Sequence, residues 1–261
     1  MKLVVKIGGS TLTSPATLDS LAPQLASLVE EGATVYIVHG AGPHISARML
    51  ELGLTPRFEN GLRVTDEATL EVVKAELLAV NSEIAGVLSL NGLDIEVKGP
   101  ETGVFKAVKA SSENIDLGLV GEVTGVDLDS LESGKVSVIA PLGFDGKKFY
   151  NINADHAAMA LAGAVDADAL VFLSDVDGVL LNRNDPASLI KQLRPGQAED
   201  LIASGSVQGG MIQKLKNSIE ALTLGVRRVC ITDGRRAGSL IEAALNRMNF
   251  GTTLLQEGQL S

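Results

Sequence analysis

The sequence predicts an α/β fold in which a mostly parallel sheet lies between two layers of helices. Short apolar, β-branched runs alternate with longer stretches of helical periodicity along all 261 residues. Several of the short runs are almost continuously apolar, which is typical of parallel strands that are covered on both faces. A glycine also stands just past four of the helical stretches, where a left-handed C-cap favours it, at Gly32, Gly53, Gly92 and Gly225.

The strands of this sheet are expected at six segments. In chain order they are residues 3–7, 34–39, 94–97, 136–140, 169–173 and 229–232. The middle of the chain, residues 98–126, differs from this pattern. Segments 105–109 and 122–124 there predict the strands of an exposed hairpin.

Helices are expected between the strands, at residues 17–31, 44–52, 66–90, 155–165, 197–203, 211–224 and 239–247. No low-complexity linker, charge run or internal repeat interrupts this alternation. The sequence therefore predicts a single domain over residues 1–261, with an N-terminal lobe of about 1–150 and a C-terminal lobe of about 151–261.

Charge and composition exclude several classes of function. The chain has 22 Lys and Arg against 32 Asp and Glu, a net charge of −10, which disfavours binding to nucleic acid or to an anionic membrane. The single cysteine, Cys230, excludes an internal disulfide and a zinc cluster. No apolar run reaches the ~18–20 residues of a membrane span, and none at the N-terminus fits a signal peptide. We expect a cytoplasmic protein.

Glycines follow several of the predicted strands. Gly8-Gly9-Ser10 follows the first strand, Gly40-Ala41-Gly42 follows the second, and a loop at 204–210 opens the helix that contains Lys214. In open α/β sheets ligands bind beyond the carboxyl ends of the strands, and glycines let backbone N–H groups approach phosphate oxygens. Any one glycine pair can be a tight turn, but several at the same edge indicate a phosphate site.

Two lysines and one aspartate are the candidate catalytic residues. Lys6 interrupts an apolar strand, where an unpaired ammonium group is unfavourable, and Lys214 lies near the start of a helix, where a cation opposes the helix dipole. Asp155 stands at another helix start. Taken singly, Lys6 can be a strand-edge lysine, Lys214 an exposed one and Asp155 a capping carboxylate. Taken together, they predict two cations around an anion, with a carboxylate that holds both lysines in place.

Common nucleotide-binding and metal motifs are absent or incomplete. The sequence has no P-loop and no protein-kinase signature, and Gly40-Ala41-Gly42 lacks the third glycine of the dinucleotide fingerprint. Asp175-Val176-Asp177-Gly178 looks like the D-x-D-G motif of aspartyl-phosphate phosphatases, which leaves open a phosphatase with Asp175 as nucleophile. The three histidines, His39, His44 and His156, do not have metal-ligand spacing.

Seven segments together resemble the amino-acid kinase family: residues 5–9, 38–43, 60–66, 116–123, 150–155, 173–179 and 209–214. Two of them, Gly-Leu-Arg-Val-Thr-Asp at 61–66 and Asn-Ile-Asn-Ala-Asp at 151–155, resemble the branch that phosphorylates N-acetyl-L-glutamate in arginine biosynthesis. The resemblance implies a three-layer αβα sandwich with a mainly parallel sheet, of the carbamate kinase-like type. It implies acyl-substrate binding and dimerisation in the N-terminal lobe, ATP binding in the C-terminal lobe, and Mg²⁺ as the metal.

The resemblance also assigns site residues. It implies that Lys6 and Lys214 stabilise charge on the transferred γ-phosphoryl group and that Asp155 organises them. Arg63 and Asn151, with backbone at Ala41 and Gly42, are implied as the acyl-substrate contacts. The implied nucleotide contacts are Gly8, Gly9, Ser174, Asp175, Val176, Asp177, Gly178, Val179, Leu180, Ser206, Val207, Gln208, Gly209 and Gly210. No residue of the chain is implied as a metal ligand.

This sequence departs from the family pattern at two places. Gly40-Ala41-Gly42 replaces three consecutive glycines, and the stretch around 94–100 lacks a Ser-Gly-x-Asp pattern. Both departures lie on the acyl-substrate side. The chain also begins four residues before its first matched residue, Val5, without the N-terminal extension that resembles the device of arginine-sensing hexamers. We therefore expect a homodimer that does not respond to arginine.

A carboxylate acceptor of the glutamate type has a pKa of ~4.3 and is already an anion at neutral pH, so its attack needs no general base. In-line transfer then depends on positioning and on electrostatic stabilisation. Three alternatives stay open: a kinase of an aminoadipate or glutamate side chain held by a carrier protein, as in lysine biosynthesis, the phosphatase, and a catalytically silent binding module.

Overall fold

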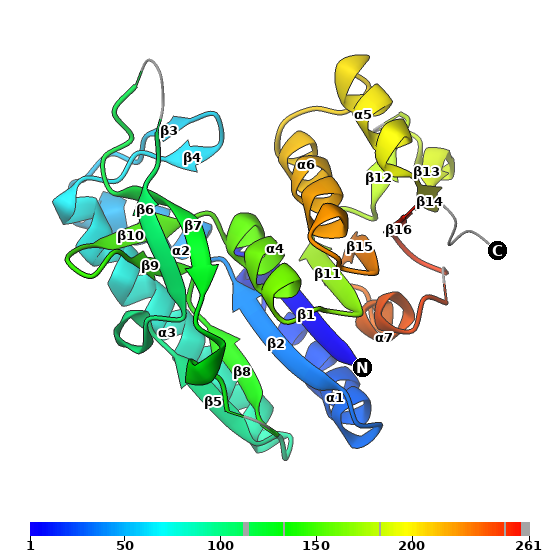
Figure 1. The fold of residues 1–261 in the computed structure, drawn as a ribbon, viewed down its shortest axis with the longest axis horizontal. Helices are drawn as coiled ribbons and strands as arrows, with labels where there is room; N and C mark the ends of the chain where they lie inside the picture. The colour runs from blue at the N-terminus through cyan, green and yellow to red at the C-terminus, as the bar shows by residue number, and fades with distance from the viewer. Residues whose placement is uncertain (112–114, 133, 183, 248, 257–261) are drawn as a thin grey trace.

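Eight strands form the central sheet of the computed structural model, which describes residues 1–111, 115–132, 134–182, 184–247 and 249–256 (Figure 1). The strand order is β14-β16-β15-β11-β1-β2-β8-β5, and each neighbouring pair is parallel except β15 with β16. The strands are β1 (Lys2–Ile7), β2 (Thr34–His39), β5 (Ile95–Lys98), β8 (Val136–Ile139), β11 (Ala169–Ser174), β14 (Gln192–Leu193), β15 (Arg228–Asp233) and β16 (Thr252–Leu255). All six predicted strands are present with nearly the predicted bounds.

Helices cover the two faces of this sheet, as Figure 1 shows, and the described residues form seven of them. They are α1 (Pro15–Glu30), α2 (Gly42–Glu51), α3 (Glu67–Leu90), α4 (Ala154–Ala164), α5 (Pro195–Ala203), α6 (Gly210–Thr223) and α7 (Ser239–Ala244). Each corresponds to a predicted helix, although α7 ends at Ala244 rather than at residue 247. The four predicted C-cap glycines all have positive φ.

The alternation of side chains along β1 divides the interior into two cores. Leu3, Val5 and Ile7 pack with residues of α1, α2, α3 and α7, whereas Val4 packs with residues of α4, α5 and α6. Successive side chains of a strand point to opposite faces of the sheet, so this division places helices on both faces. The predicted three-layer αβα sandwich with a mainly parallel sheet is confirmed.

A small closed barrel lies on the α4 side of the sheet. Its strands are β6 (Phe105–Lys109), β7 (Val120–Val126), β9 (Leu142–Phe144) and β10 (Phe149–Ile152). The predicted pairing of 105–109 with 122–124 is correct, but the prediction that these strands are exposed is wrong for one face. Phe105 and Ala107 are 0% and 2% exposed, because β9 and β10 close the barrel over them.

The part of the chain that the structure describes also contains two short hairpins and four 3-10 turns. The hairpins join β3 (Phe58–Glu59) to β4 (Leu62–Arg63) and β12 (Val179–Leu180) to β13 (Leu189–Ile190). The 3-10 turns are η1 (Thr11–Thr13), η2 (Pro100–Thr102), η3 (Leu128–Ser130) and η4 (Pro186–Ser188). No helix within the described ranges has the length and apolar character needed to cross a membrane.

Candidate active site

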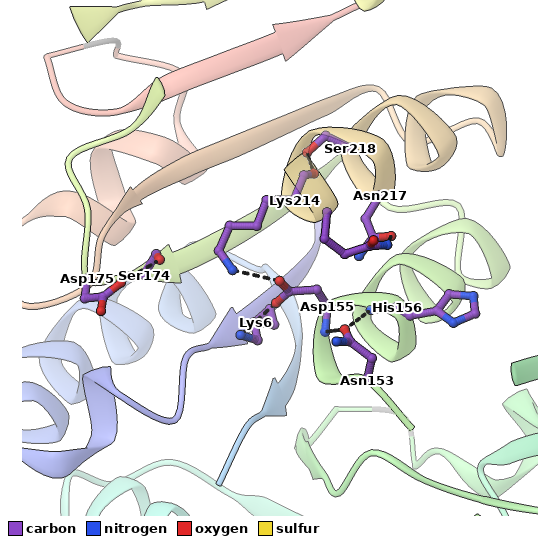
Figure 2. Close-up of polar contacts among 10 residues, drawn as sticks. Lys6, Asn153, Asp155, His156, Ser174, Asp175, Lys214, Asn217 and Ser218 are labelled. Carbon is purple, nitrogen blue, oxygen red and sulfur yellow. Dashed lines mark hydrogen bonds and ion pairs between the residues drawn. The ribbon is translucent and has the colours of Figure 1, made fainter. Parts of the chain in front are cut away.

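The side chains of Lys6 and Lys214 meet at the carboxylate of Asp155 (Figure 2). Lys6 Nζ lies 2.7 Å from Asp155 Oδ1, and Lys214 Nζ lies 2.7 Å from Asp155 Oδ2. The three side chains are only 9%, 16% and 10% exposed for Lys6, Lys214 and Asp155, respectively. The structure therefore brings the three candidate catalytic residues together, from opposite ends of the chain, in a largely buried cluster.

Local structure explains how the three side chains converge. Lys6 follows Val4 by two positions on β1, so it points to the face covered by α4 and α6. Asp155 is held at the start of α4, where Asn153 Oδ1 accepts hydrogen bonds from the backbone N–H groups of Asp155 and His156. Lys214 lies on α6, which begins at Gly210, so it stands in the second helical turn. Its conflict with the helix dipole is correspondingly weaker than the sequence indicates.

The cluster has an excess of positive charge. Burial alone would raise the pKa of Asp155, but the charges of Lys6 and Lys214 and their hydrogen bonds outweigh that effect and hold the pKa at about 2. Burial lowers the pKa of Lys6, and the nearby charge of Asp155 partly opposes that shift. At neutral pH one carboxylate thus faces two cations, which favours the binding of a further anion beside the lysines.

Two glycine loops lie against each other beside Lys6. A Cβ atom on Gly9 would approach the backbone N of Gly42 to 2.8 Å, and one on Gly40 would lie 3.1 Å from the backbone N of Gly9. The loops after β1 and β2 therefore pack backbone to backbone, which only glycine allows. Ala41 is 2% exposed and packs in the core with α1, α2 and α3. Its methyl group therefore exposes little surface.

A pocket of about 150 Å³ opens beside these loops. The four predicted acyl-substrate residues all line it: Ala41, Gly42, Arg63 and Asn151. Sequence reasoning missed other lining residues, among them Phe58 and Leu62 of the β3–β4 hairpin, Leu77 of α3 and Asn153. We call this the acyl pocket, after the acyl-substrate contacts predicted among its lining residues.

Arg63 supplies a buried cation to the acyl pocket. Its Nη2 donates to the carbonyl of Gly42 (3.0 Å) and to Ser46 Oγ (2.8 Å), and the ring of Phe58 lies 4.7 Å from its Cζ. Burial lowers the pKa of Arg63. In the described part of the chain no carboxylate pairs with this guanidinium group, so a ligand with a carboxylate can supply the missing partner.

A larger pocket of about 750 Å³ lies at the carboxyl end of β11 and the start of α6. Ten of the predicted nucleotide contacts line it: Ser174, Asp175, Val176, Gly178, Leu180, Ser206, Val207, Gln208, Gly209 and Gly210. Lys214 also lines it, together with Leu181, Asn182 and Met211, which the sequence did not indicate. We call this the glycine-lined pocket.

Four predicted nucleotide contacts lie outside that lining. Gly8 and Gly9 lie in the loop after β1, where Gly8 N–H donates to the carbonyl of Leu173 (2.9 Å). Val179 is fully buried, and its N–H donates to Thr252 Oγ1 (2.8 Å). Asp177 instead forms an ion pair with Arg236 at 3.8 Å.

The lysine–aspartate cluster lies between residues that line the two pockets. Asn153 and Ala154, which immediately precede Asp155, line the acyl pocket, and Lys214 lines the glycine-lined pocket. The described residues include no group of three or more His, Cys, Asp or Glu side chains able to hold a metal ion. His39 is buried with its Nε2 2.6 Å from Asn81 Oδ1, and burial lowers its pKa to about 4. The site thus combines two pockets with a cluster of two lysines and one aspartate that is linked to both linings.

Comparison with known proteins gives a consistent result. A model of the amino acid kinase family matches residues 1–233. The chain is 38% identical over 267 residues to the acetylglutamate kinase of Carboxydothermus hydrogenoformans, an alignment that covers 97% of this chain and 91% of the relative. It is 39% identical over 271 residues to the acetylglutamate kinase of Sinorhizobium fredii, covering 97% of this chain and 90% of the relative.

Solved structures agree in fold. N-acetylglutamate synthase from Neisseria gonorrhoeae, complexed with coenzyme A and N-acetyl-glutamate, matches with a TM-score of 0.87 at 26% identity. That match covers 100% of this chain but only 60% of the synthase chain. Carbamate kinase from Giardia lamblia bound to AMP-PNP matches with a TM-score of 0.72 at 15% identity, covering 98% of both chains, and shows a likeness of fold alone.

Proposed function

The chain belongs to the amino acid kinase family, and from that premise we propose that it transfers the γ-phosphoryl group of ATP to the side-chain carboxylate of N-acetyl-L-glutamate, a step of arginine biosynthesis. The observation that carries the proposal is the lysine–aspartate cluster that is linked to both pocket linings. Lys6 and Lys214 lie there on one carboxylate, between a small pocket lined by Arg63 and a larger pocket lined by glycines.

The acyl pocket fits a small dicarboxylate with a neutral amide. Arg63 pairs with one carboxylate of the substrate, and Asn151 contacts its amide group. The second carboxylate, the acceptor, then lies toward Asn153 and Ala154 and so toward the lysines. The runner-up is a kinase that acts on a carrier-linked side chain. The relatives at 38–39% identity, which are acetylglutamate kinases, favour the free amino-acid derivative.

The lysines reduce the repulsion between the two reacting anions. In phosphoryl transfer, charge spreads over the equatorial oxygens of the transferred group, and fixed cations stabilise it. Asp155 positions both ammonium groups and takes no proton, because its pKa of about 2 keeps it ionised and both of its oxygens face lysines. The acceptor is itself an anion at neutral pH, so the transfer needs no general base.

The glycine-lined pocket is proposed as the ATP site. Backbone N–H groups at Gly209 and Gly210, at the start of α6, suit phosphate oxygens. Mg²⁺ is usually held mostly by substrate phosphates and water, so it needs few protein ligands. When bound with ATP, the metal neutralises phosphate charge.

The proposed homodimer is supported by the free edge of the sheet at β5. Val97 on β5 is 43% exposed, and Leu78 and Leu90 of α3 are 36% and 89% exposed. Pairing two copies along this edge would cover these side chains. A particle mass of two chains in solution is expected, and a monomer would contradict the assignment. The two lobes, the cytoplasmic location and the lack of response to arginine stay predictions.

The experiment that tests the function is ATP consumption with hydroxylamine trapping of the acyl phosphate. N-acetyl-L-glutamate, glutamate and N-acetyl-aspartate are compared under identical conditions. The proposal predicts hydroxamate with N-acetyl-L-glutamate in at least tenfold excess over the other two acceptors. Equal products from all three would contradict the assigned substrate. Release of phosphate from simple phosphate esters without nucleotide would instead favour the phosphatase with Asp175 as nucleophile.

A further inference from the structure

We propose that Thr65 is a positioning residue of the acyl pocket and that its hydroxyl group determines which atom of the Asn151 amide faces the substrate. The inference rests on the proposed function, because it concerns how the same pocket recognises an N-acyl group. Thr65 follows β4, is fully buried, and does not itself line the acyl pocket.

The Thr65 hydroxyl links the backbone of Arg63 to the side chain of Asn151, the two residues proposed to bind the acyl substrate. Thr65 Oγ1 donates to the backbone carbonyl of Arg63 at 2.7 Å, and Asn151 Nδ2 donates to Thr65 Oγ1 at 3.1 Å. A hydroxyl group has one hydrogen, which is already committed to Arg63. Thr65 Oγ1 can therefore only accept from Asn151, and an amide turned the other way would place two acceptors against each other. The amino group of Asn151 must face Thr65.

This orientation leaves Asn151 Oδ1 for the ligand. Asn151 lines the acyl pocket, and within the described part of the chain its side chain bonds through Nδ2, to Thr65, and not through Oδ1. A carbonyl oxygen accepts from N–H and has no donor of its own. The pocket is therefore built for a carboxylate at Arg63 together with an N–H donor at Asn151, which matches an N-acyl amino acid.

Backbone hydrogen bonds hold Thr65 firmly in this place. Thr65 N–H donates to the carbonyl of Leu117 (3.0 Å), and Leu119 N–H donates to the carbonyl of Thr65. Asn151 N–H in turn donates to the carbonyl of Leu119 at 2.9 Å, so segment 117–119 links Thr65 to β10. Gly118, at φ +71°, permits this contact because a Cβ there would collide with the Thr65 carbonyl. Thr65 and Asn151 are therefore fixed relative to each other.

Kinetic comparison of three variants tests the role of the hydroxyl group. Thr65→Val removes it with little change of shape, and Thr65→Ser retains it. Thr252→Val is the matched control, since Thr252 is equally buried and its hydroxyl also bridges an N–H, of Val179, and a carbonyl, of Ile190. We expect Thr65→Val to raise the KM for N-acetyl-L-glutamate on the order of tenfold, leaving the KM for ATP within about twofold. Thr65→Ser restores the wild-type KM, and Thr252→Val leaves this KM unchanged.

A substrate analogue separates orientation from simple loss of stability. In 2-acetoxyglutarate an ester oxygen replaces the amide N–H, so it cannot donate to Asn151 Oδ1. The wild-type protein should prefer the amide over this ester in kcat/KM by at least tenfold. In Thr65→Val the Asn151 amide is free to turn, so the ratio of kcat/KM for the amide to kcat/KM for the ester should fall toward one. If the wild type phosphorylates N-acetyl-L-glutamate while Thr65→Val keeps both its KM and its preference, the inference is wrong and the proposed function stands.

The hydrogen bond can also be examined in the wild-type protein, without relying on a variant that folds or on activity. The side-chain NH₂ signals of Asn151 are assigned in a ¹⁵N–¹H spectrum by their loss in Asn151→Asp. One of the two protons should exchange slowly with solvent, because it is bonded to buried Thr65. Fast exchange of both would overturn the inference. Slow exchange in a protein that does not phosphorylate N-acetyl-L-glutamate would support the positioning role and reject the proposed substrate.

Discussion

Lys6 and Lys214 contact opposite oxygens of a single carboxylate, although they come from the first strand of the sheet and from a helix near the other end of the chain. Each ammonium group lies 2.7 Å from its oxygen of Asp155. Because one carboxylate compensates only one of the two positive charges, the arrangement favours binding of a further anion. The proposed phosphoryl transfer depends on this arrangement of the two lysines.

Replacing either lysine with alanine should impair the chemical step. For Lys6→Ala and Lys214→Ala we expect kcat to fall by roughly a hundredfold or more, since a few kcal/mol of transition-state stabilisation is lost. Steady-state kinetics with saturating substrates provide the measurement. Lys216→Ala is the matched control, because Lys216 is exposed on the same helix and should retain wild-type turnover. Wild-type kcat in either of the first two variants would remove that lysine from the mechanism.

Shortening the arginine head group should weaken substrate binding more than turnover. In Arg63→Lys the fork that contacts both Gly42 and Ser46 is lost, and an ammonium group cannot bind a carboxylate in two places. The KM for N-acetyl-L-glutamate should rise about tenfold or more, with a smaller change in kcat. Arg48→Lys, at an exposed ion pair with Glu51, serves as the control. An unchanged KM would show that Arg63 does not bind the substrate.

Much of this fold was predictable because burial on both faces leaves a clear signal. Strands such as β11 are almost wholly apolar, and helix ends carry glycine C-caps. Strands β9, β10, β14 and β16 were missed, as were the four short strands of the two hairpins, β3, β4, β12 and β13. β14, at the edge of the sheet, has only two residues, and the neighbouring β16 has four, of which two are threonine. Neither therefore shows the long apolar run of a central strand. β9 and β10 gain their burial only from barrel closure, which joins segments far apart in sequence.

The site was predictable where its residue types were unusual for the local sequence around them. Lys6 in an apolar strand and glycines after strands are visible in the sequence, and the structure places them at one edge of the sheet. Phe58 had no such signal, because its position over Arg63 depends on how the β3–β4 hairpin folds. The bond between Thr65 and Asn151 likewise joins distant segments.

The neutral state of His39 should make stability depend on pH. Its pKa is about 4 in the folded protein against about 6.5 when unfolded, because burial disfavours the charged ring. The contribution is fully present above pH 6.5. Between pH 6.5 and 4 only the unfolded chain takes up the proton. The contribution of His39 to the free energy of unfolding is therefore lost as pH falls through this range, by about a few kcal/mol in total. Urea unfolding of wild type and His39→Gln at several pH values measures this difference. If the free energy of unfolding changes with pH equally in the two proteins, the prediction is wrong.

The contact between the two glycine loops should not tolerate a methyl group. A Cβ on residue 9 would lie 2.8 Å from the backbone N of Gly42, so Gly9→Ala should push the loops apart and lower kcat/KM by at least tenfold. Gly86→Ala is the control, because a Cβ there meets nothing within 4 Å and alanine favours the helix. Equal activity of the two variants would show that the loop contact is dispensable.

The most direct test of the shared-anion account is a crystal structure of the protein with ADP, N-acetyl-L-glutamate and aluminium fluoride, a planar mimic of the transferred phosphoryl group. We predict that Lys6 Nζ and Lys214 Nζ both lie within hydrogen-bond distance of the fluoride ligands. The same structure should place the substrate carboxylate in line with the leaving oxygen of ADP. A complex in which either ammonium group faces away from the mimic would contradict the central claim.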